Sequence, residues 1–235
     1  VLDHVGVTLG RRAVVRDVHL SFSAGTLTGI VGPNGAGKST LTRAMLALVP
    51  ATGTVRVDGV DVAALPRAAL ARPTAYIPPP HLAPMSRIGR GDAAAIERAM
   101  ARADVIDLRH RIATLLSGGE RTRALFARAL AVEAPALIAD EPLASLDPGH
   151  QIDVMDMLRA EAVGGALVIA VLHDLTLAAR YCDRLILIDE GRIVADGTPG
   201  EVLTVDRLRA VYGIETVVDT NGAWPKITTF GRSAR

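Results

Sequence analysis

A glycine-rich segment carries the first residues whose types and spacing could do chemistry. It reads Gly32-Pro33-Asn34-Gly35-Ala36-Gly37-Lys38-Ser39-Thr40 and stands between a predicted strand and a predicted helix. Glycines let backbone N–H groups turn inward around the β- and γ-phosphates, and the helix N-terminus adds a favourable dipole. We expect Lys38 to reach the phosphate oxygens and Ser39 to ligate Mg²⁺. The segment therefore predicts a binding site for a nucleoside triphosphate.

Two adjacent carboxylates, Asp140 and Glu141, end an apolar segment that begins at Ala136. An aspartate at the carboxyl end of a buried strand can hold Mg²⁺ beside a phosphate loop. Glu141, one residue later, can polarise the attacking water as a general base. Taken alone, the pair is explained equally well by a solvated turn. Together with a phosphate loop, it indicates hydrolysis of the bound nucleotide.

A second candidate anion site is Leu116-Ser117-Gly118-Gly119-Glu120, which opens a predicted helix. Ser117 is a favourable N-cap, and the two glycines expose backbone N–H groups at the positive end of the helix. A single nucleotide does not need two such sites from one chain, unless they face each other across a dimer. An ordinary Ser-Gly-Gly helix cap is the alternative interpretation.

The elements that must position these residues alternate along the chain. Short apolar or alternating segments predict strands over residues 14–22, 26–31, 54–57, 74–77, 136–139, 166–172, 185–188 and 193–196. Helical spacing covers residues 38–48, 92–103, 120–132, 149–162 and 175–179. Asp58-Gly59 predicts a hairpin turn. Strands that alternate with helices predict an α/β fold with a largely parallel sheet, and the consecutive helices between Pro80 and Pro135 predict a helical insert.

Bulk composition narrows the class of protein. A chain of 235 residues suits one large domain or a core with a subdomain. The net charge of +1 gives no electrostatic argument for binding nucleic acid. The single cysteine, Cys182, cannot form an internal disulfide and is compatible with a reducing cytoplasm. No apolar run approaches the ~18–20 residues that a membrane-spanning helix needs.

The order of these motifs, with Ser145-Leu146-Asp147 and His173, resembles that of nucleotide-binding subunits of ABC transporters over nearly the whole chain. The resemblance implies a P-loop NTPase (RecA-like) core with a mostly parallel sheet, an N-terminal antiparallel β subdomain and a helical insert. It further implies that residues 1–235 form a single ABC ATPase domain. Residues 1–79 and 135–235 would then form the catalytic core with the β subdomain, and residues 80–134 a helical signature subdomain.

The same resemblance implies a head-to-tail homodimer that hydrolyses ATP with the help of Mg²⁺. Each ATP would lie between Lys38 and Ser39 of one chain and Ser117, Gly118 and Gly119 of the other. Asp147 would connect the two sites across the interface. The catalytic residues would be Lys38, Glu141 and His173, with His173 contacting the γ-phosphate and orienting Glu141 and the water. The metal ligands would be Ser39 and Asp140.

Two departures from the family pattern bear on activity. The family usually has a glutamine after the strand that corresponds to residues 74–77, whereas here Pro78 is followed by Pro79. Only 38 positions separate Pro79 from Ser117, fewer than the family usually has. We therefore expect a segment to be missing from the sequence here, with a natural deletion as the alternative. The second departure is the adenine platform, for which Leu9 stands in place of the usual aromatic residue.

Several segments resemble bacterial importers of iron chelates, haem and cobalamin: Leu172 to Arg184, Asp196 to Leu203, Leu146 to Gln151, and Val211-Tyr212-Gly213. In that group the ATPase is a separate chain that pairs with transmembrane permease subunits. A substrate-binding protein delivers the cargo to these subunits. We therefore expect a peripheral protein on the cytoplasmic face of the inner membrane, with no nucleic-acid partner. The alternatives are a soluble ABC-type ATPase without a transporter, and an ATP-binding subunit with impaired hydrolysis.

Overall fold

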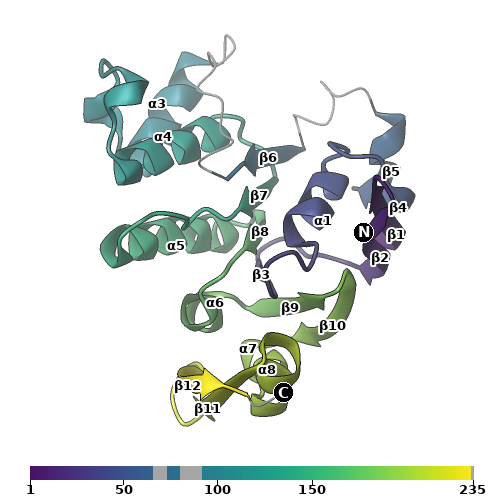
Figure 1. The fold of residues 1–235 in the computed structure, drawn as a ribbon. Helices are drawn as coiled ribbons and strands as arrows, with labels where there is room; N and C mark the ends of the chain where they lie inside the picture. The colour runs from purple at the N-terminus through teal and green to yellow at the C-terminus, as the bar shows by residue number, and fades with distance from the viewer. Residues whose placement is uncertain (66–72, 80–91, 234–235) are drawn as a thin grey trace.

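The computed structural model describes residues 1–65, 73–79 and 92–233, and a six-stranded sheet lies at its centre (Figure 1). Neighbouring strands in this sheet follow the order β10-β9-β3-β8-β7-β6. All adjacent pairs are parallel except β9 with β10, which is antiparallel. In chain order the strands are β3 (Leu27–Val31), β6 (Thr74–Ile77), β7 (Ala136–Asp140), β8 (Leu167–Val171), β9 (Arg184–Asp189) and β10 (Arg192–Gly197).

The two faces of this sheet are covered by different elements, because successive side chains of a strand point to opposite faces. Leu137 and Ala139 of β7 pack into one apolar cluster with α5 (Pro148–Val163) and α6 (Leu175–Tyr181). Ile138 packs into a second cluster, with α1 (Lys38–Met45) and the antiparallel sheet. Burial on both faces explains why the central strands β7 and β8 are apolar at nearly every position.

The antiparallel sheet has the strand order β2-β1-β4-β5. Its strands are β1 (Leu2–Leu9), β2 (Arg12–Leu20), β4 (Thr52–Val57) and β5 (Val60–Asp61), and a 3₁₀ turn, η1 (Val62–Ala64), follows. The buried residues of β1 and β2 pack with α1 in one cluster, at spacings of two and three residues, and the other side of the sheet is left exposed. Val57 pairs with Val60, so the hairpin predicted at Asp58-Gly59 is confirmed.

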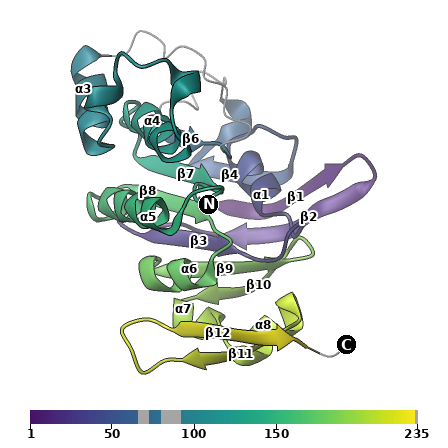
Figure 2. The same ribbon diagram turned by 60° about the vertical axis from the view of Figure 1, so that its left-hand side comes forward.

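The helical insert joins β6 to β7. Between residues 92 and 134 it contains α3 (Ala93–Arg102), two 3₁₀ turns, η2 (Ile106–Leu108) and η3 (Ala113–Leu115), and α4 (Gly118–Leu130). Figures 1 and 2 show α3 and α4 at one end of the molecule, beyond the β6 edge of the central sheet. Phe126 of α4 is fully buried in the same cluster as β7 and α5, and thereby anchors the insert to the core.

The C-terminal part lies beyond β10, at the opposite end from the insert (Figure 2). It contains α7 (Pro199–Val202), α8 (Val205–Tyr212) and a hairpin of β11 (Ile214–Asp219) and β12 (Lys226–Arg232). The sequence did not predict this hairpin, because most of its residues are exposed and give no apolar pattern. No helix among the residues that the structure describes is long and apolar enough to cross a bilayer.

The predicted architecture agrees with the structure: a mostly parallel central sheet, an antiparallel N-terminal sheet and a helical insert. The main differences are the unpredicted C-terminal hairpin and shifted element ends, such as those of β2, which spans residues 12–20 where residues 14–22 were predicted. The suspected join between Pro79 and Leu82 includes residues 80–82, which lie outside the described residues.

Phe126 tests how the insert is anchored. Phe126→Ala should lower the free energy of unfolding by roughly 3–5 kcal/mol, because it removes a fully buried aromatic ring and leaves a cavity. Chemical denaturation measures the change. Phe230→Ala removes the same ring from a side chain that is 70% exposed, and should change stability by less than about 0.5 kcal/mol. Equal losses in the two variants would contradict the packing described here.

Candidate active site

The carboxyl ends of four parallel strands meet at one edge of the central sheet. Strand β3 leads into the phosphate loop, β8 leads to His173, β7 ends at Asp140, and β6 carries Tyr76 near its end. Since β8 lies between β3 and β7, His173 emerges between the phosphate loop and the two carboxylates. Ligands bind at this edge of open α/β sheets. The sheet order therefore gathers residues that lie far apart in the sequence.

The phosphate loop has the backbone conformation that its glycines allow. Gly37 caps α1 with a φ of 104°, in the left-handed region that L-residues rarely adopt. A Cβ atom at this position would also lie 2.7 Å from the carbonyl oxygen of Val14. Only glycine fits here, so the N-terminus of α1 is open toward the site and its first N–H groups can face an anion.

Lys38 lies inside the loop that it is predicted to serve. Its side chain is almost fully buried, and Nζ donates hydrogen bonds to the carbonyl oxygens of Gly32 at 2.7 Å and Pro33 at 2.8 Å. Burial lowers the pKa of Lys38, while Glu141 and Asp140 act in the opposite direction. The ammonium is therefore held at the loop, next to the place where phosphate oxygens would enter.

Ser39 and Asp140 meet as the sequence predicts for a metal site. The Ser39 hydroxyl donates a hydrogen bond to Asp140 Oδ1 at 2.8 Å, and Asp140 is fully buried. Burial raises the pKa of Asp140, and the neighbouring charge of Glu141 acts in the same direction. A hydroxyl and a carboxylate are the hard oxygen ligands that Mg²⁺ prefers, so this pair fits the ion.

Tyr76 is a site residue that the sequence analysis missed. Its hydroxyl donates a hydrogen bond to Asp140 Oδ2 at 3.3 Å, so the two carboxylate oxygens have different partners. Burial, followed by the charge of Asp140, raises the pKa of Tyr76 to about 12, and Arg43 hydrogen-bonds the same hydroxyl. The available signal was the alternation of β6, because Ala75 and Ile77 join one apolar cluster while Tyr76 faces the other.

Glu141 and His173 form the reactive pair of the site. His173 Nε2 lies 3.0 Å from Glu141 Oε1, and both side chains are partly exposed. Glu141 has a φ of 52°, in the left-handed region that non-glycine residues rarely adopt, directly after β7. The pair opens into a cavity of about 560 Å³, lined by Val14, Asn34, Gly35, Gly37, Lys38, Ser39, Thr40, Glu141 and His173.

The other predicted site residues do not line this cavity. Leu9 is the last residue of β1 and is 47% exposed, whereas Val14 of β2 contributes to the cavity wall. Ser117 caps α4 by accepting a hydrogen bond from the Glu120 N–H at 3.3 Å, and Glu120 Oε2 accepts one from the Ser117 N–H at 2.8 Å. Asp147 caps α5 by accepting a hydrogen bond from the His150 N–H at 3.0 Å.

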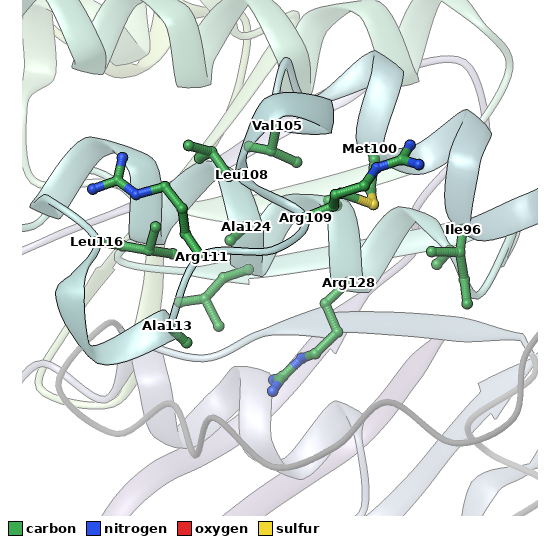
Figure 3. A pocket seen from close by; sticks show the side chains of 13 residues that line it. Ile96, Met100, Val105, Leu108, Arg109, Arg111, Ala113, Leu116, Ala124 and Arg128 are labelled. Carbon is green, nitrogen blue, oxygen red and sulfur yellow. The ribbon is translucent and has the colours of Figure 1, made fainter.

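A second cavity lies within the helical insert and has a different character (Figure 3). It has a volume of about 320 Å³ and is lined mainly by apolar residues of α3 and α4 and the turns between them, with Arg109, Arg111 and Arg128 among its walls. No acidic or nucleophilic side chain is among its described lining residues, so this cavity is not a candidate catalytic site.

Asp140→Asn should make the nucleotide-free protein more stable at pH 7. The pKa of Asp140 is higher in the folded state than the ~3.9 of an exposed aspartate. At pH values between these two pKa values, the folded protein therefore binds more protons than the unfolded chain. The wild type therefore loses stability relative to the variant as pH rises from about 4, until the pH exceeds the folded-state pKa. Thermal melts between pH 4 and 8 measure the gap, and a gap that does not change with pH would contradict the raised pKa.

Comparison with known proteins places this site in a family. Residues 15–144 match the ABC transporter family. A cobalamin import ATP-binding protein of Halobacterium salinarum is 44% identical over 97% of this chain, which spans 62% of that protein. Hemin import ATP-binding proteins of Rhodococcus jostii and Streptomyces coelicolor are 40% and 44% identical over 90% and 88% of this chain, which cover 78% and 80% of those proteins.

Solved structures agree on the fold. CbiO1 of Clostridium perfringens, part of an ABC transporter complex, superposes with a TM-score of 0.77 at 22% identity, covering 89% of this chain and 92% of that one. A dimeric bacterial ABC transporter cassette superposes with a TM-score of 0.73 at 24% identity, covering 84% and 97%. With the fold, the phosphate loop and the sequence matches in agreement, this chain belongs to the ABC transporter family.

Proposed function

We propose that this chain is the ATP-hydrolysing subunit of an importer. The observation that carries the proposal is the 3.0 Å contact between Glu141 and His173, in the same cavity as Lys38 and Ser39 of the phosphate loop. A carboxylate oriented by an imidazole beside a phosphate site is what hydrolysis of a phosphoanhydride requires. Binding of a nucleotide alone would need neither side chain.

The chain's own residues supply positioning and proton transfer. Lys38 is held where it can leave its two loop carbonyls and pair with the γ-phosphate. Glu141 accepts the proton of the attacking water, and His173 fixes the orientation of its carboxylate. When bound, Mg²⁺ held by Ser39 and Asp140 would neutralise phosphate charge. Tyr76 keeps the Asp140 carboxylate in place through its second oxygen.

A head-to-tail homodimer would complete the site. Ser117, Gly118 and Gly119 form the N-terminus of α4, a 13-residue helix, but they do not line the phosphate-loop cavity of their own chain. Ser117 and Gly118 are exposed, and the positive end of a helix of this length favours an anion. We therefore assign this end to the ATP held by the other chain, with Asp147 near the interface.

The relatives suggest the cargo and the partners. Their names describe import of cobalamin or hemin, and we propose a cargo of this kind, an iron-siderophore, haem or cobalamin. Transmembrane permease subunits would contact the helical insert within residues 80–134. A substrate-binding protein would deliver the cargo to these subunits. Residues 1–79 and 135–235 would act as the catalytic core. The protein would be peripheral, on the cytoplasmic face of the inner membrane.

Impaired hydrolysis is the second candidate, and one observation favours it. No glutamine follows β6 at Pro78 or Pro79. The alignment with the Halobacterium relative is 252 positions long, longer than this chain, so that relative has residues which this chain lacks. A soluble ABC ATPase without a transporter is the third candidate. Measurement of ATP turnover with and without permease-containing membranes separates the three.

Glu141→Gln should retain ATP binding and abolish hydrolysis, because the amide keeps the shape of the side chain but cannot accept the proton. We expect turnover to fall at least ~100-fold, and ATP to produce a stable dimer in size-exclusion chromatography. Glu215→Gln alters an exposed glutamate that pairs with Arg209, and should hydrolyse ATP normally. If Glu141→Gln turns over ATP at the wild-type rate, Glu141 is not the base.

Lys38→Ala should remove measurable ATP binding, because it deletes the buried ammonium that the loop positions for phosphate. Isothermal titration calorimetry measures the affinity. The only other lysine of the chain, Lys226, is exposed on β12, so Lys226→Ala is a matched control and should bind ATP like the wild type. Equal affinities in the two variants would exclude Lys38 from the phosphate site.

A further inference from the structure

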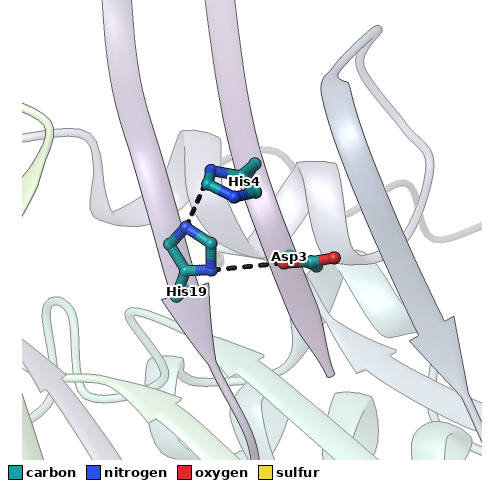
Figure 4. Close-up of side chains that lie close together, drawn as sticks. All are labelled: Asp3, His4 and His19. Atoms are coloured by element: carbon teal, nitrogen blue, oxygen red, sulfur yellow. Dashed lines mark hydrogen bonds and ion pairs between the residues drawn. The ribbon is translucent and has the colours of Figure 1, made fainter.

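A cluster of histidine and aspartate side chains lies on the exposed side of the antiparallel sheet, separate from the nucleotide cavity. Asp3 and His4 belong to β1, and Asp17 and His19 belong to the adjacent strand β2. Figure 4 shows Asp3, His4 and His19 turned toward one another. Their ligand atoms all lie within 4.8 Å of one another. The proposed transport ATPase makes no use of these residues.

Two irregularities in the strand pairing build the cluster. The register shifts between the Leu2–Leu20 and Val5–Val18 pairs, so Asp3 and His4 together lie opposite His19. A second shift between the Val5 and Val7 pairs accommodates Asp17 on β2. His4 and Asp17 have φ values of 51° and 53°, as the extra residue of a bulge can have. In a regular strand Asp3 and His4 would point to opposite faces.

Three potential ligand atoms converge in this cluster. His4 Nδ1 lies 2.6 Å from Asp17 Oδ1 and 2.9 Å from His19 Nε2, and His19 Nε2 lies 3.5 Å from Asp17 Oδ1. The carboxylate oxygen can only accept, so in any protonation state of the two rings at least one of the three contacts brings two donors or two acceptors together. A cation at their centre would instead use the lone pair of each atom.

We propose that His4, Asp17 and His19 bind a divalent transition-metal ion such as Zn²⁺. Ligands at zinc distances in a tetrahedron are about 3.3 Å apart, close to the separations found here. The most crowded pair, His4 Nδ1 and Asp17 Oδ1, has to separate by less than 1 Å, which exposed side chains can do by rotation. Two imidazoles and one carboxylate select zinc, copper or nickel over Mg²⁺.

Asp3 completes the arrangement without contacting the ion. Its Oδ1 lies 3.3 Å from His19 Nδ1, the ring nitrogen that faces away from His4 and Asp17. Histidines that bind metals usually donate their other ring N–H to a carboxylate, which fixes the tautomer and the ring orientation. The four side chains are between 48% and 69% exposed, so the remaining coordination position is open to water and the ion can exchange with solvent.

Titration of the full chain with Zn²⁺ in nucleotide-free buffer tests the proposal by calorimetry. His4→Asn removes the imidazole with a residue that tolerates positive φ, and His19→Ala removes the second ring. Loss of a carboxylate that only hydrogen-bonds a metal ligand costs roughly 10–100-fold in metal affinity, so Asp3→Asn should weaken Zn²⁺ binding by about that factor. His4→Asn and His19→Ala each remove a ligand and should weaken Zn²⁺ binding by more. His110→Ala removes an exposed histidine of the helical insert and should leave the step unchanged.

Electron paramagnetic resonance of the Cu²⁺-loaded chain gives a second readout. The wild type should show coupling to two nitrogen ligands, and His19→Ala to one. This distinguishes the cluster from the Glu141–His173 and Asp147–His150 pairs, which each offer a single imidazole. Zn²⁺ binding that is unchanged in both His4→Asn and His19→Ala, or a wild type that binds no Zn²⁺, would overturn the proposal.

Discussion

The parallel register of β3, β8 and β7 is the constraint on which the active site depends. The phosphate loop, His173 and Glu141 are separated by long stretches of sequence, and they meet only because these strands end at the same edge of the sheet. Burial of both faces fixes the register, since a slip of one residue would exchange the clusters into which the side chains of a strand pack. The apolar core thereby determines where the polar chemistry occurs.

The site also places ionisable side chains where they are shielded from water. Asp140 and Lys38 are nearly or fully buried, and their pKa values are shifted in the directions that disfavour charge. Hydrogen bonds from Ser39 and Tyr76 to Asp140 and from Lys38 to the loop carbonyls offset part of this cost. A highly charged phosphate–metal ligand would offset the rest. The site is therefore organised for a ligand at the expense of stability without one.

Local patterns could be predicted from the sequence, and features that depend on strand pairing could not. The phosphate loop and the Asp140-Glu141 pair are each formed by consecutive residues, and the apolar strands are recognisable from their own residues. The fold and these two motifs could therefore be predicted. Tyr76 and Val14 reach the site only through the order of strands in the two sheets. The His4–His19 cluster arises from two bulges, which no spacing rule in β1 or β2 indicates. The exposed C-terminal hairpin gave no apolar pattern.

The proposed head-to-tail dimer rests on the separation of two helix N-termini, because the start of α4 does not line the cavity at the start of α1 in the same chain. The capping box of Ser117 and Glu120 orders the N-terminus of α4 before any ligand arrives. A Cβ on Gly119 would lie 2.5 Å from the ring of His150, whose Nδ1 is 2.5 Å from Asp147 Oδ2. The start of α4 is therefore packed directly against the start of α5. In the proposed head-to-tail dimer, a partner's phosphate bound at the start of α4 would therefore also lie close to the start of α5, where Asp147 stands.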